Sequence, residues 1–205
     1  MRHDSQAAHK IKTQITAYAQ ELTVTQKRPS AKFVFQMLYG IVASGSLHLS
    51  KIGRYVQGKE KLLATIKRFS RQLRNPQLGR TLQPVYAEQM GSHVASQTVL
   101  AVDLSEIVKP YAKAMEYLAQ VDDGSTKATH EPGYNFIDVT AVTDERVLPL
   151  YGRLYSNVAP DWRSENVHML EAFAATRQAT DGEGIFVIDR GGDRPVVFAD
   201  FLEGI

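Results

Sequence analysis

Apolar residues recur at helical spacing through the first third of the chain. Within residues 31–43 they fall three or four positions apart, and a short segment that Ser50 can cap repeats this pattern. Within residues 59–74 a single apolar stripe recurs at intervals of four, three and four positions (Leu62, Ile66, Phe69, Leu73). We predict a helical domain over residues 31–75, preceded by a polar, helical lead-in over residues 1–30.

The pattern changes to that of strands in the second half of the chain. Residues 76–96 contain two prolines and two glycines, so we predict a linker or irregular connection there. Beyond it we predict three strands, a helix that Ser164 caps, a fourth strand and a last helix from about Pro195 (strands 98–102, 134–142, 146–155 and 184–188; helices 164–179 and 195–202). This order predicts a mixed α/β fold in which residues 97–205 form the first part of a ribonuclease H-like sheet, with the fourth strand beside the first.

Charge divides the chain into a basic part and an acidic part. Residues 1–90 contain 15 Lys and Arg against 4 Asp and Glu, and residues 91–205 contain 9 against 18, although the net charge is only +2. A basic first part is typical of a module that binds a polyanion. An uneven surface charge without a function is the alternative.

The basic residues concentrate on the last predicted helix of the first part. Two short helices joined by a glycine turn, the second of them basic, are typical of a helix-turn-helix motif that binds double-stranded DNA. A helical bundle whose basic face is only solvated would have the same pattern. The DNA-binding candidates are the basic residues of residues 59–74, all expected to be exposed (Lys61, Lys67, Arg68, Arg71, Arg74).

Two aspartates directly follow predicted strands. Asp103 follows residues 98–102, and Asp189 follows residues 184–188. If these strands are neighbours in the middle of the sheet, an ionised carboxylate there is costly unless a cation compensates it. Two carboxylates with substrate phosphate oxygens suit a pair of Mg²⁺ or Mn²⁺ ions. We therefore predict that Asp103 and Asp189 are catalytic metal ligands for phosphodiester hydrolysis or strand transfer.

Each aspartate also has a structural interpretation, because aspartates at strand ends often cap a turn or the next helix. Glu106 is either a helper ligand or a solvated side chain, and Asp193 is expected to cap the last helix.

The six histidines show no zinc-ligand spacing, the chain has no cysteine, and no P-loop, nucleophile elbow or dinucleotide fingerprint is present. No apolar run is long enough to cross a membrane, so we expect a cytoplasmic, nucleoid-associated protein.

Several segments resemble parts of the DDE transposases of bacterial insertion sequences. Residues 99–105, followed by residues 109–116 and 121–125, resemble the first-aspartate region of that family. Residues 185–193 are similar to its second-aspartate strand, in which Asp-Arg-Gly precedes a helix. Residues 66–70 are similar to its domain that binds transposon ends.

This resemblance implies an RNase H-like catalytic core, dependence on Mg²⁺, terminal inverted repeats as the DNA substrate and a homodimer in the synaptic complex. It carries over Asp103 and Asp189 as catalytic residues. The family's third acid, a glutamate in a Tyr-x-x-Arg-x-x-x-Glu-x-x-x-x-x-x-Lys setting, does not occur in these 205 residues. We therefore expect a fragment, a truncated remnant or the first half of a split reading frame, with little or no catalytic activity.

Two other functions stay open. A truncated chain that still binds DNA could act as a non-catalytic inhibitor of a full-length transposase. Alternatively, the chain is an RNase H-like nuclease whose last acid is Glu106 or Asp193.

Overall fold

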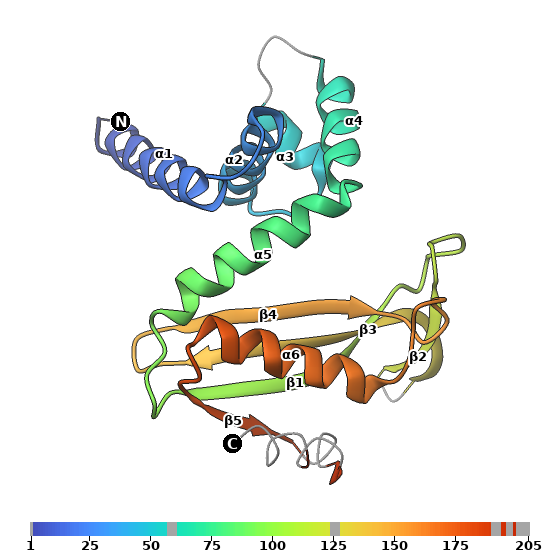
Figure 1. Ribbon diagram of the computed structural model, residues 1–205. Coiled ribbons are helices and arrows are strands. Elements are labelled where there is room, and N and C mark those ends of the chain that lie inside the picture. The colour runs from blue at the N-terminus through green and yellow to red at the C-terminus, as the bar shows by residue number, and fades with distance from the viewer. Residues whose placement is uncertain (1, 57–60, 124–127, 190–193, 196–198, 200–205) are drawn as a thin grey trace. The chain divides into compact units, whose positions relative to one another are not determined.

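The computed structural model describes residues 2–56, 61–123, 128–189, 194–195 and 199. These residues form two compact units, Met1–Val85 and Tyr86–Ile205, which we call the helical unit and the sheet unit. The described residues contain six helices and a mixed sheet of five strands, so the predicted mixed α/β class is confirmed. Figure 1 shows the course of the chain.

The helical unit is built on helices that pack through aromatic and aliphatic side chains. Phe33 and Phe69 meet edge to face with ring centroids 5.6 Å apart, and Ile52 is fully buried beside them. The second helix ends at Gly45, which adopts the left-handed conformation (φ 57°) and donates its N–H to the Ile41 carbonyl at 2.9 Å. The helices are, in order, α1 (Arg2–Leu22), α2 (Arg28–Ser44), α3 (Leu49–Val56), α4 (Leu62–Leu73) and the start of α5 (Pro76–Gly91).

Residues 76–91 form the helix α5, so the prediction of an irregular connection there was wrong. Pro76 is the first residue of the helix, where a missing N–H costs no hydrogen bond. The Asn75 side chain accepts a hydrogen bond from the Gln77 N–H at 3.1 Å and caps the first turn. Pro84 lies inside the helix, where it cannot donate a backbone hydrogen bond, and Leu78 and Leu82 of the same helix pack in the core of the helical unit. The division between the two units falls within α5.

The sheet unit contains three long antiparallel strands and a short parallel one. β1 (Val99–Val108) pairs with β3 (Ala128–Val142), which also pairs with β4 (Val147–Tyr155). β2 (Ala119–Asp123) pairs with the first part of β3, and sequence patterning did not predict this strand. β5 (Ile185–Ile188) pairs in parallel with β1, which confirms the prediction that the fourth predicted strand lies beside the first.

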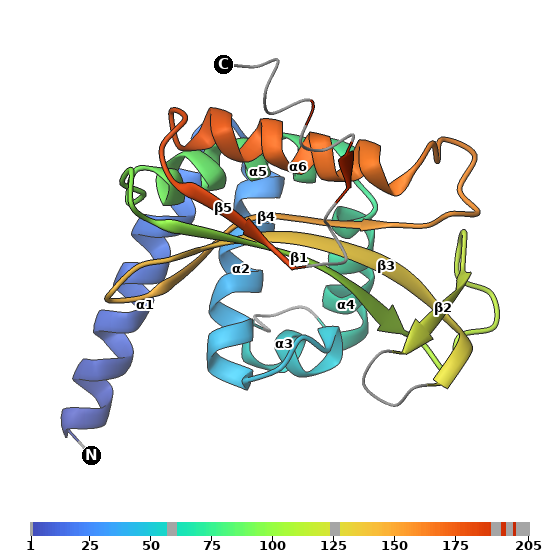
Figure 2. The same cartoon turned by 90° about the horizontal axis from the view of Figure 1, so that it is seen from below.

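Helix α6 (Glu165–Ala179) covers one face of the sheet, as Figures 1 and 2 show. It begins as predicted, because the Ser164 hydroxyl accepts a hydrogen bond from the Val167 N–H at 3.4 Å. Met169 and Phe173 project from α6 onto Leu100 and other buried residues of the strands. This contact forms the hydrophobic core of the sheet unit.

The opposite face of the sheet carries apolar side chains that stay exposed to solvent. Val99, Val142, Ile185 and Val187 lie on this face, and Val187 is 50% exposed. Because side chains alternate along a strand, each of these residues is next to one that points into the core. Most of the predicted last helix, from Pro195 to Leu202, lies outside the described residues.

No single helix among the described residues is long and apolar enough to cross a membrane. Helices α2 and α3 reach the required length and composition only as a pair, and the chain bends by 101° at the break between them.

Candidate functional site

Asp103 lies in the middle of β1, with five further residues of the strand after it, so the prediction that the strand ends at Val102 was wrong. Leu100 and Val102 point into the core beneath α6, and Leu104 packs against the same core. Asp103 therefore points to the other face of the sheet, where its side chain is exposed.

Asp189 follows directly after β5 and is also exposed. The parallel register ends with the pair Val102 and Ile188, and Asp103 and Asp189 are the residues that directly follow this pair. Asp103 lies on the side away from α6, and the alternation of β5, in which Ile188 packs against the core and Val187 is exposed, predicts the same side for Asp189 when it is continued by one residue. Neighbouring strands lie about 4.8 Å apart. The structure thus brings the two predicted site residues together.

The expected burial of these carboxylates was wrong, because water reaches both of them. Because water solvates these carboxylates, they do not need a cation to replace lost solvation. Their proximity still favours a bound cation, because two carboxylates on neighbouring strands repel each other unless a cation or another positive group lies near them.

Asp138 is an acidic neighbour of Asp103 that the sequence interpretation missed. It lies directly opposite Asp103 in the antiparallel register of β1 and β3, so both side chains point to the same face. Burial raises the pKa of Asp138, the Thr140 hydroxyl that donates to its Oδ2 at 3.1 Å lowers it, and the charge of Asp103 raises it. The alternation of Ile137 and Val139, both buried, was the signal that could have placed Asp138 on the outer face.

Glu106 does not belong to this group of carboxylates. It lies three positions after Asp103 and therefore points to the opposite face of β1. Partial burial raises the pKa of Glu106, and the carboxylates of Glu165, Asp122 and Asp103 raise it further. The other predicted alternative, Asp193, lies outside the described residues.

Carboxylate oxygens on adjacent strands are ligands of the kind that Mg²⁺ and Mn²⁺ prefer. Asp103 and Asp189 offer such oxygens at adjacent positions of one exposed face, so the donor chemistry fits these ions. Within residues 2–189, apart from the gaps given above, no three His, Asp or Glu side chains form a group that could hold a metal ion.

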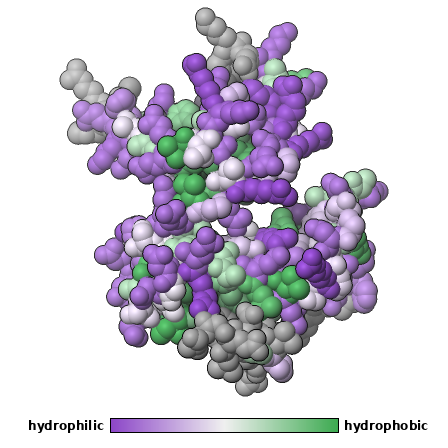
Figure 3. All heavy atoms as spheres, viewed as in Figure 1, coloured by the Kyte–Doolittle hydropathy of each residue, from purple (hydrophilic) through white to green (hydrophobic). Residues whose placement is uncertain are grey.

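Four of the five predicted DNA-binding residues are exposed on or beside α4 (Lys61, Lys67, Arg71, Arg74). Lys67, Arg71 and Arg74 follow one another at intervals of four and three positions, so they share one side of the helix. In Figure 3 the visible surface around α4 is strongly hydrophilic. The predicted apolar stripe of the helix is shorter than expected, because Leu73 is 55% exposed.

Arg68 differs from these residues, and the prediction that it is exposed was wrong. It is half-buried, and its Nη1 donates a hydrogen bond to the Gln36 Oε1 at 2.8 Å, which ties α4 to α2. Its guanidinium carbon lies 5.0 Å from the centroid of the Phe69 ring, within the range of a cation–π contact. Arg68 therefore has a structural role within the helical unit.

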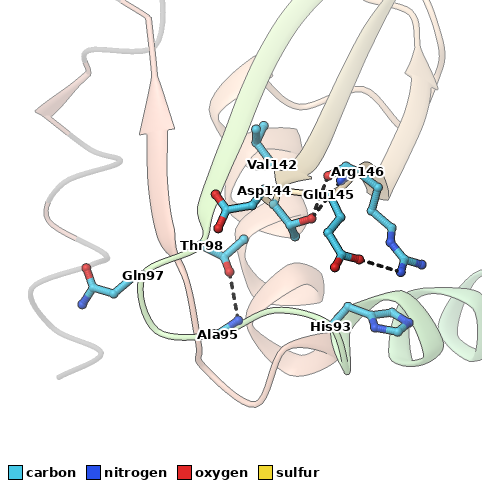
Figure 4. Close-up of a pocket in the computed structure, with 9 residues that line it drawn as sticks. His93, Ala95, Gln97, Thr98, Val142, Asp144, Glu145 and Arg146 are labelled. Carbon is cyan, nitrogen blue, oxygen red and sulfur yellow. Dashed lines mark hydrogen bonds and ion pairs between the residues drawn. The ribbon is translucent and has the colours of Figure 1, made fainter.

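A cavity of about 520 Å³ lies where β1 begins and β3 turns into β4 (Figure 4). Three of its polar residues interact with one another in the turn: the Thr143 hydroxyl donates to the Arg146 carbonyl at 2.9 Å and accepts from the Arg146 N–H at 3.1 Å, and the Arg146 guanidinium lies 3.4 Å from the Glu145 carboxylate. Neither Asp103 nor Asp189 lines this cavity, so it is not part of the carboxylate site.

The sequence was compared with protein-family models and with curated proteins. No family model matches the sequence. No curated protein matches it significantly either. The case for a function therefore depends on the residues described above.

Proposed function

We propose that this chain is a DNA transposase or its N-terminal part. In this proposal the helical unit binds double-stranded DNA at transposon ends, and the sheet unit is an RNase H-like core. Asp103 and Asp189 are two of its three metal-binding carboxylates. The observation that carries the proposal is the parallel register of β1 and β5, which places these two aspartates at adjacent positions.

The order of elements in the sheet unit supports the RNase H-like assignment. Three antiparallel strands, β1, β3 and β4, are followed by α6, which leads to β5 on the far side of β1. A helical crossover of this kind lets a later strand join the first one in parallel. The end of β5 and the middle of β1 then meet at the proposed site.

The chain's own residues have simple roles in this proposal. Asp103 and Asp189 would hold the cations through their carboxylate oxygens. The chemistry that bound Mg²⁺ supplies is activation of a water or 3′-hydroxyl and stabilisation of the leaving oxygen. Because the third acid of the family motif is missing from these residues, we expect weak metal binding and poor strand cleavage.

The charge of α4 supports DNA as the partner. Lys67, Arg71 and Arg74 form a row of cations along one side of the helix, suited to the phosphates of a duplex. A homodimer in the synaptic complex and a location on the nucleoid follow from the proposed activity.

Titration of the full chain with MnCl₂, followed by electron paramagnetic resonance of the free ion, tests the carboxylate site. We expect a weak Mn²⁺ site that Asp103→Asn and Asp189→Asn each abolish. Asp144→Asn is the matched control, because Asp144 is an exposed aspartate in the β3–β4 turn, away from the site. Absence of Mn²⁺ binding, or binding unchanged in both site variants, would contradict the proposal.

Asp138 favours a second candidate, an RNase H-like nuclease. It lies directly opposite Asp103 on the same face, although with Asp189 it forms no three-residue metal-binding group among the described residues. A plasmid-nicking assay separates the candidates: robust nicking that Asp138→Asn abolishes indicates a nuclease. Salt-dependent duplex binding without nicking or Mn²⁺ binding indicates the non-catalytic inhibitor of a full-length transposase.

A further inference from the structure

A second cavity, of about 280 Å³, lies at the end of the sheet unit where β4 leads into α6. Three tyrosines, a tryptophan, a histidine and an arginine contribute to its lining (Tyr117, Tyr134, Tyr155, Trp162, His168, Arg153). None of these residues takes part in the carboxylate site. We infer that this cavity binds an unpaired nucleobase of single-stranded DNA by stacking it on the aromatic rings.

The cavity has a rigid floor and more exposed walls. Tyr155 is buried, its ring lies 4.4 Å from that of His168, and its hydroxyl donates to the Glu165 Oε1 at 2.9 Å. Tyr117 and Trp162 are 46% and 39% exposed, so a ligand can reach both rings. Rings held at the rim of a cavity are available to stack on a ligand ring.

Tyr117 is held at the rim at a cost in backbone energy. Its φ of 50° lies in the left-handed region, which bulky side chains seldom adopt. The Tyr134 hydroxyl donates to the adjacent Glu116 carbonyl at 2.5 Å and fixes this part of the connection to β3. The surrounding structure thus keeps an aromatic ring in place where a turn-forming residue would be less strained.

The hydrogen-bonding groups of the lining favour a base over a quaternary ammonium ion. An aromatic cavity can also bind a quaternary ammonium ion. Here, however, the guanidinium of Arg153 lies in the wall, held by an ion pair with Glu171, which also lies 3.3 Å from the His168 Nδ1. The Arg153 N–H groups can donate to a base carbonyl, and a quaternary ammonium ion has no such acceptor. Asp161, also in the lining, can accept a hydrogen bond from a base N–H.

The size of the cavity is consistent with one ring system. Its volume of about 280 Å³ is close to the lower end of the range for small-molecule pockets, roughly 300 Å³. The inference rests on the proposed function only in taking DNA as the ligand. Figure 1 shows that the β4–α6 connection and β2 lie at the same end of the sheet, so the cavity is built from segments far apart in the chain.

Trp162 provides the test, because it is the only tryptophan in the sequence. The full chain is titrated with an octamer of deoxythymidine and with an abasic octamer that has the same number of phosphates, and Trp162 fluorescence is recorded. We expect quenching by the thymine octamer and at least about fivefold weaker apparent binding of the abasic one, since each stacked base contributes on this scale. Equal quenching by the two octamers, or quenching by tetramethylammonium at lower concentrations than by the thymine octamer, would overturn the inference.

A matched pair of variants tests the contribution of the rim. Tyr117→Asn removes the ring but suits the left-handed backbone, and we expect it to weaken octamer binding on the order of tenfold. Tyr111→Asn is the control, because Tyr111 is 94% exposed in the same connection and does not line the cavity. Equal effects of the two variants would argue against a site at Tyr117.

Different measurements test the base-binding cavity and the proposed transposase function. Duplex binding that depends on Lys67 and Arg71, without a base-dependent change in Trp162 fluorescence, overturns the cavity assignment alone. Base-dependent quenching with no Mn²⁺ site at Asp103 and Asp189 supports the cavity assignment and contradicts the transposase proposal.

Discussion

Gly91, the last residue of α5, lies directly against the carbonyl oxygen of Ala179, the last residue of α6. A β-carbon at position 91 would come within 1.9 Å of this oxygen and 2.6 Å of its carbon. Both atoms belong to the backbone, so a side-chain rotation cannot relieve the clash. The absence of a side chain at residue 91 therefore allows the ends of the two helices to meet within the sheet unit.

Gly91→Ala should destabilise the sheet unit by about 1–3 kcal/mol, because the backbone must move to admit the methyl group. Urea unfolding monitored through Trp162, which belongs to this unit, measures the effect. Gly79→Ala is the control: Gly79 lies in α5 with no atom within 4 Å of the place that a methyl group would occupy, and we expect the Trp162 transition to stay unchanged or rise slightly. Equal effects of the two substitutions would contradict the close contact.

The elements that the sequence predicted well are those whose pattern reflects burial on one side. The alternation of β3 and β4 and the spacing of α6 are of this kind, because each places its apolar residues on the shared core. β2 could not be found in this way. Its sequence, AQVDD, has a single β-branched residue, and pairing with β3, which lies further along the chain, makes it a strand.

The site was predictable in position but not in environment. Residues 99–102 form a continuous apolar run, which indicates burial on both faces of a strand, yet Val99 and its neighbours on β5 are exposed on the outer face. The adjacency of Asp103 and Asp189 followed from the order of elements. Asp138 required the register of β1 with β3, which depends on long-range pairing that the local pattern does not specify.

Neighbouring basic residues of α4 should have different effects on DNA binding. Lys67→Ala removes an exposed cation, so we expect weaker duplex binding and a decrease of about one in the slope of log K against log salt concentration. Arg68→Ala removes a residue that binds Gln36, so we expect a loss of about 1 kcal/mol in stability and an unchanged salt slope. Fluorescence anisotropy of a labelled duplex at several salt concentrations measures the first effect, and thermal unfolding the second. A lower salt slope in Arg68→Ala would mean that its guanidinium contacts phosphate.

Asp138 should make the stability of the sheet unit depend on pH. Burial and the charge of Asp103 raise its pKa in the folded state, so its ionised form is less favourable there than in the unfolded chain. Below the unfolded-state pKa the carboxyl group of Asp138 is protonated in both states, and its contribution to the free energy of unfolding is complete. This contribution is lost as the pH rises through the folded-state pKa. Asp138→Asn, which keeps an acceptor for Thr140, should therefore be more stable than the unchanged chain at neutral pH and nearly equal to it near pH 3. Urea unfolding of both proteins at the two pH values measures this difference in stability. A difference of the same size at both pH values would exclude ionisation of Asp138 as its cause.

Asp103 should destabilise the sheet unit when no cation is bound. It lies opposite Asp138 and beside the strand that leads to Asp189, and like charges directly across a ladder are unfavourable. In the presence of a chelator we expect Asp103→Asn to raise the unfolding free energy by roughly 0.5 kcal/mol. Added Mn²⁺ should then stabilise the unchanged chain but not the variant, because a ligand that binds only the folded state shifts unfolding in its favour. The free energy of unfolding of Asp144→Asn should equal that of the unchanged chain both with the chelator and with Mn²⁺, since Asp144 lies in the β3–β4 turn, away from the site. If the chelator left Asp103→Asn less stable than the unchanged chain, repulsion between these carboxylates could not be the main electrostatic interaction at the site.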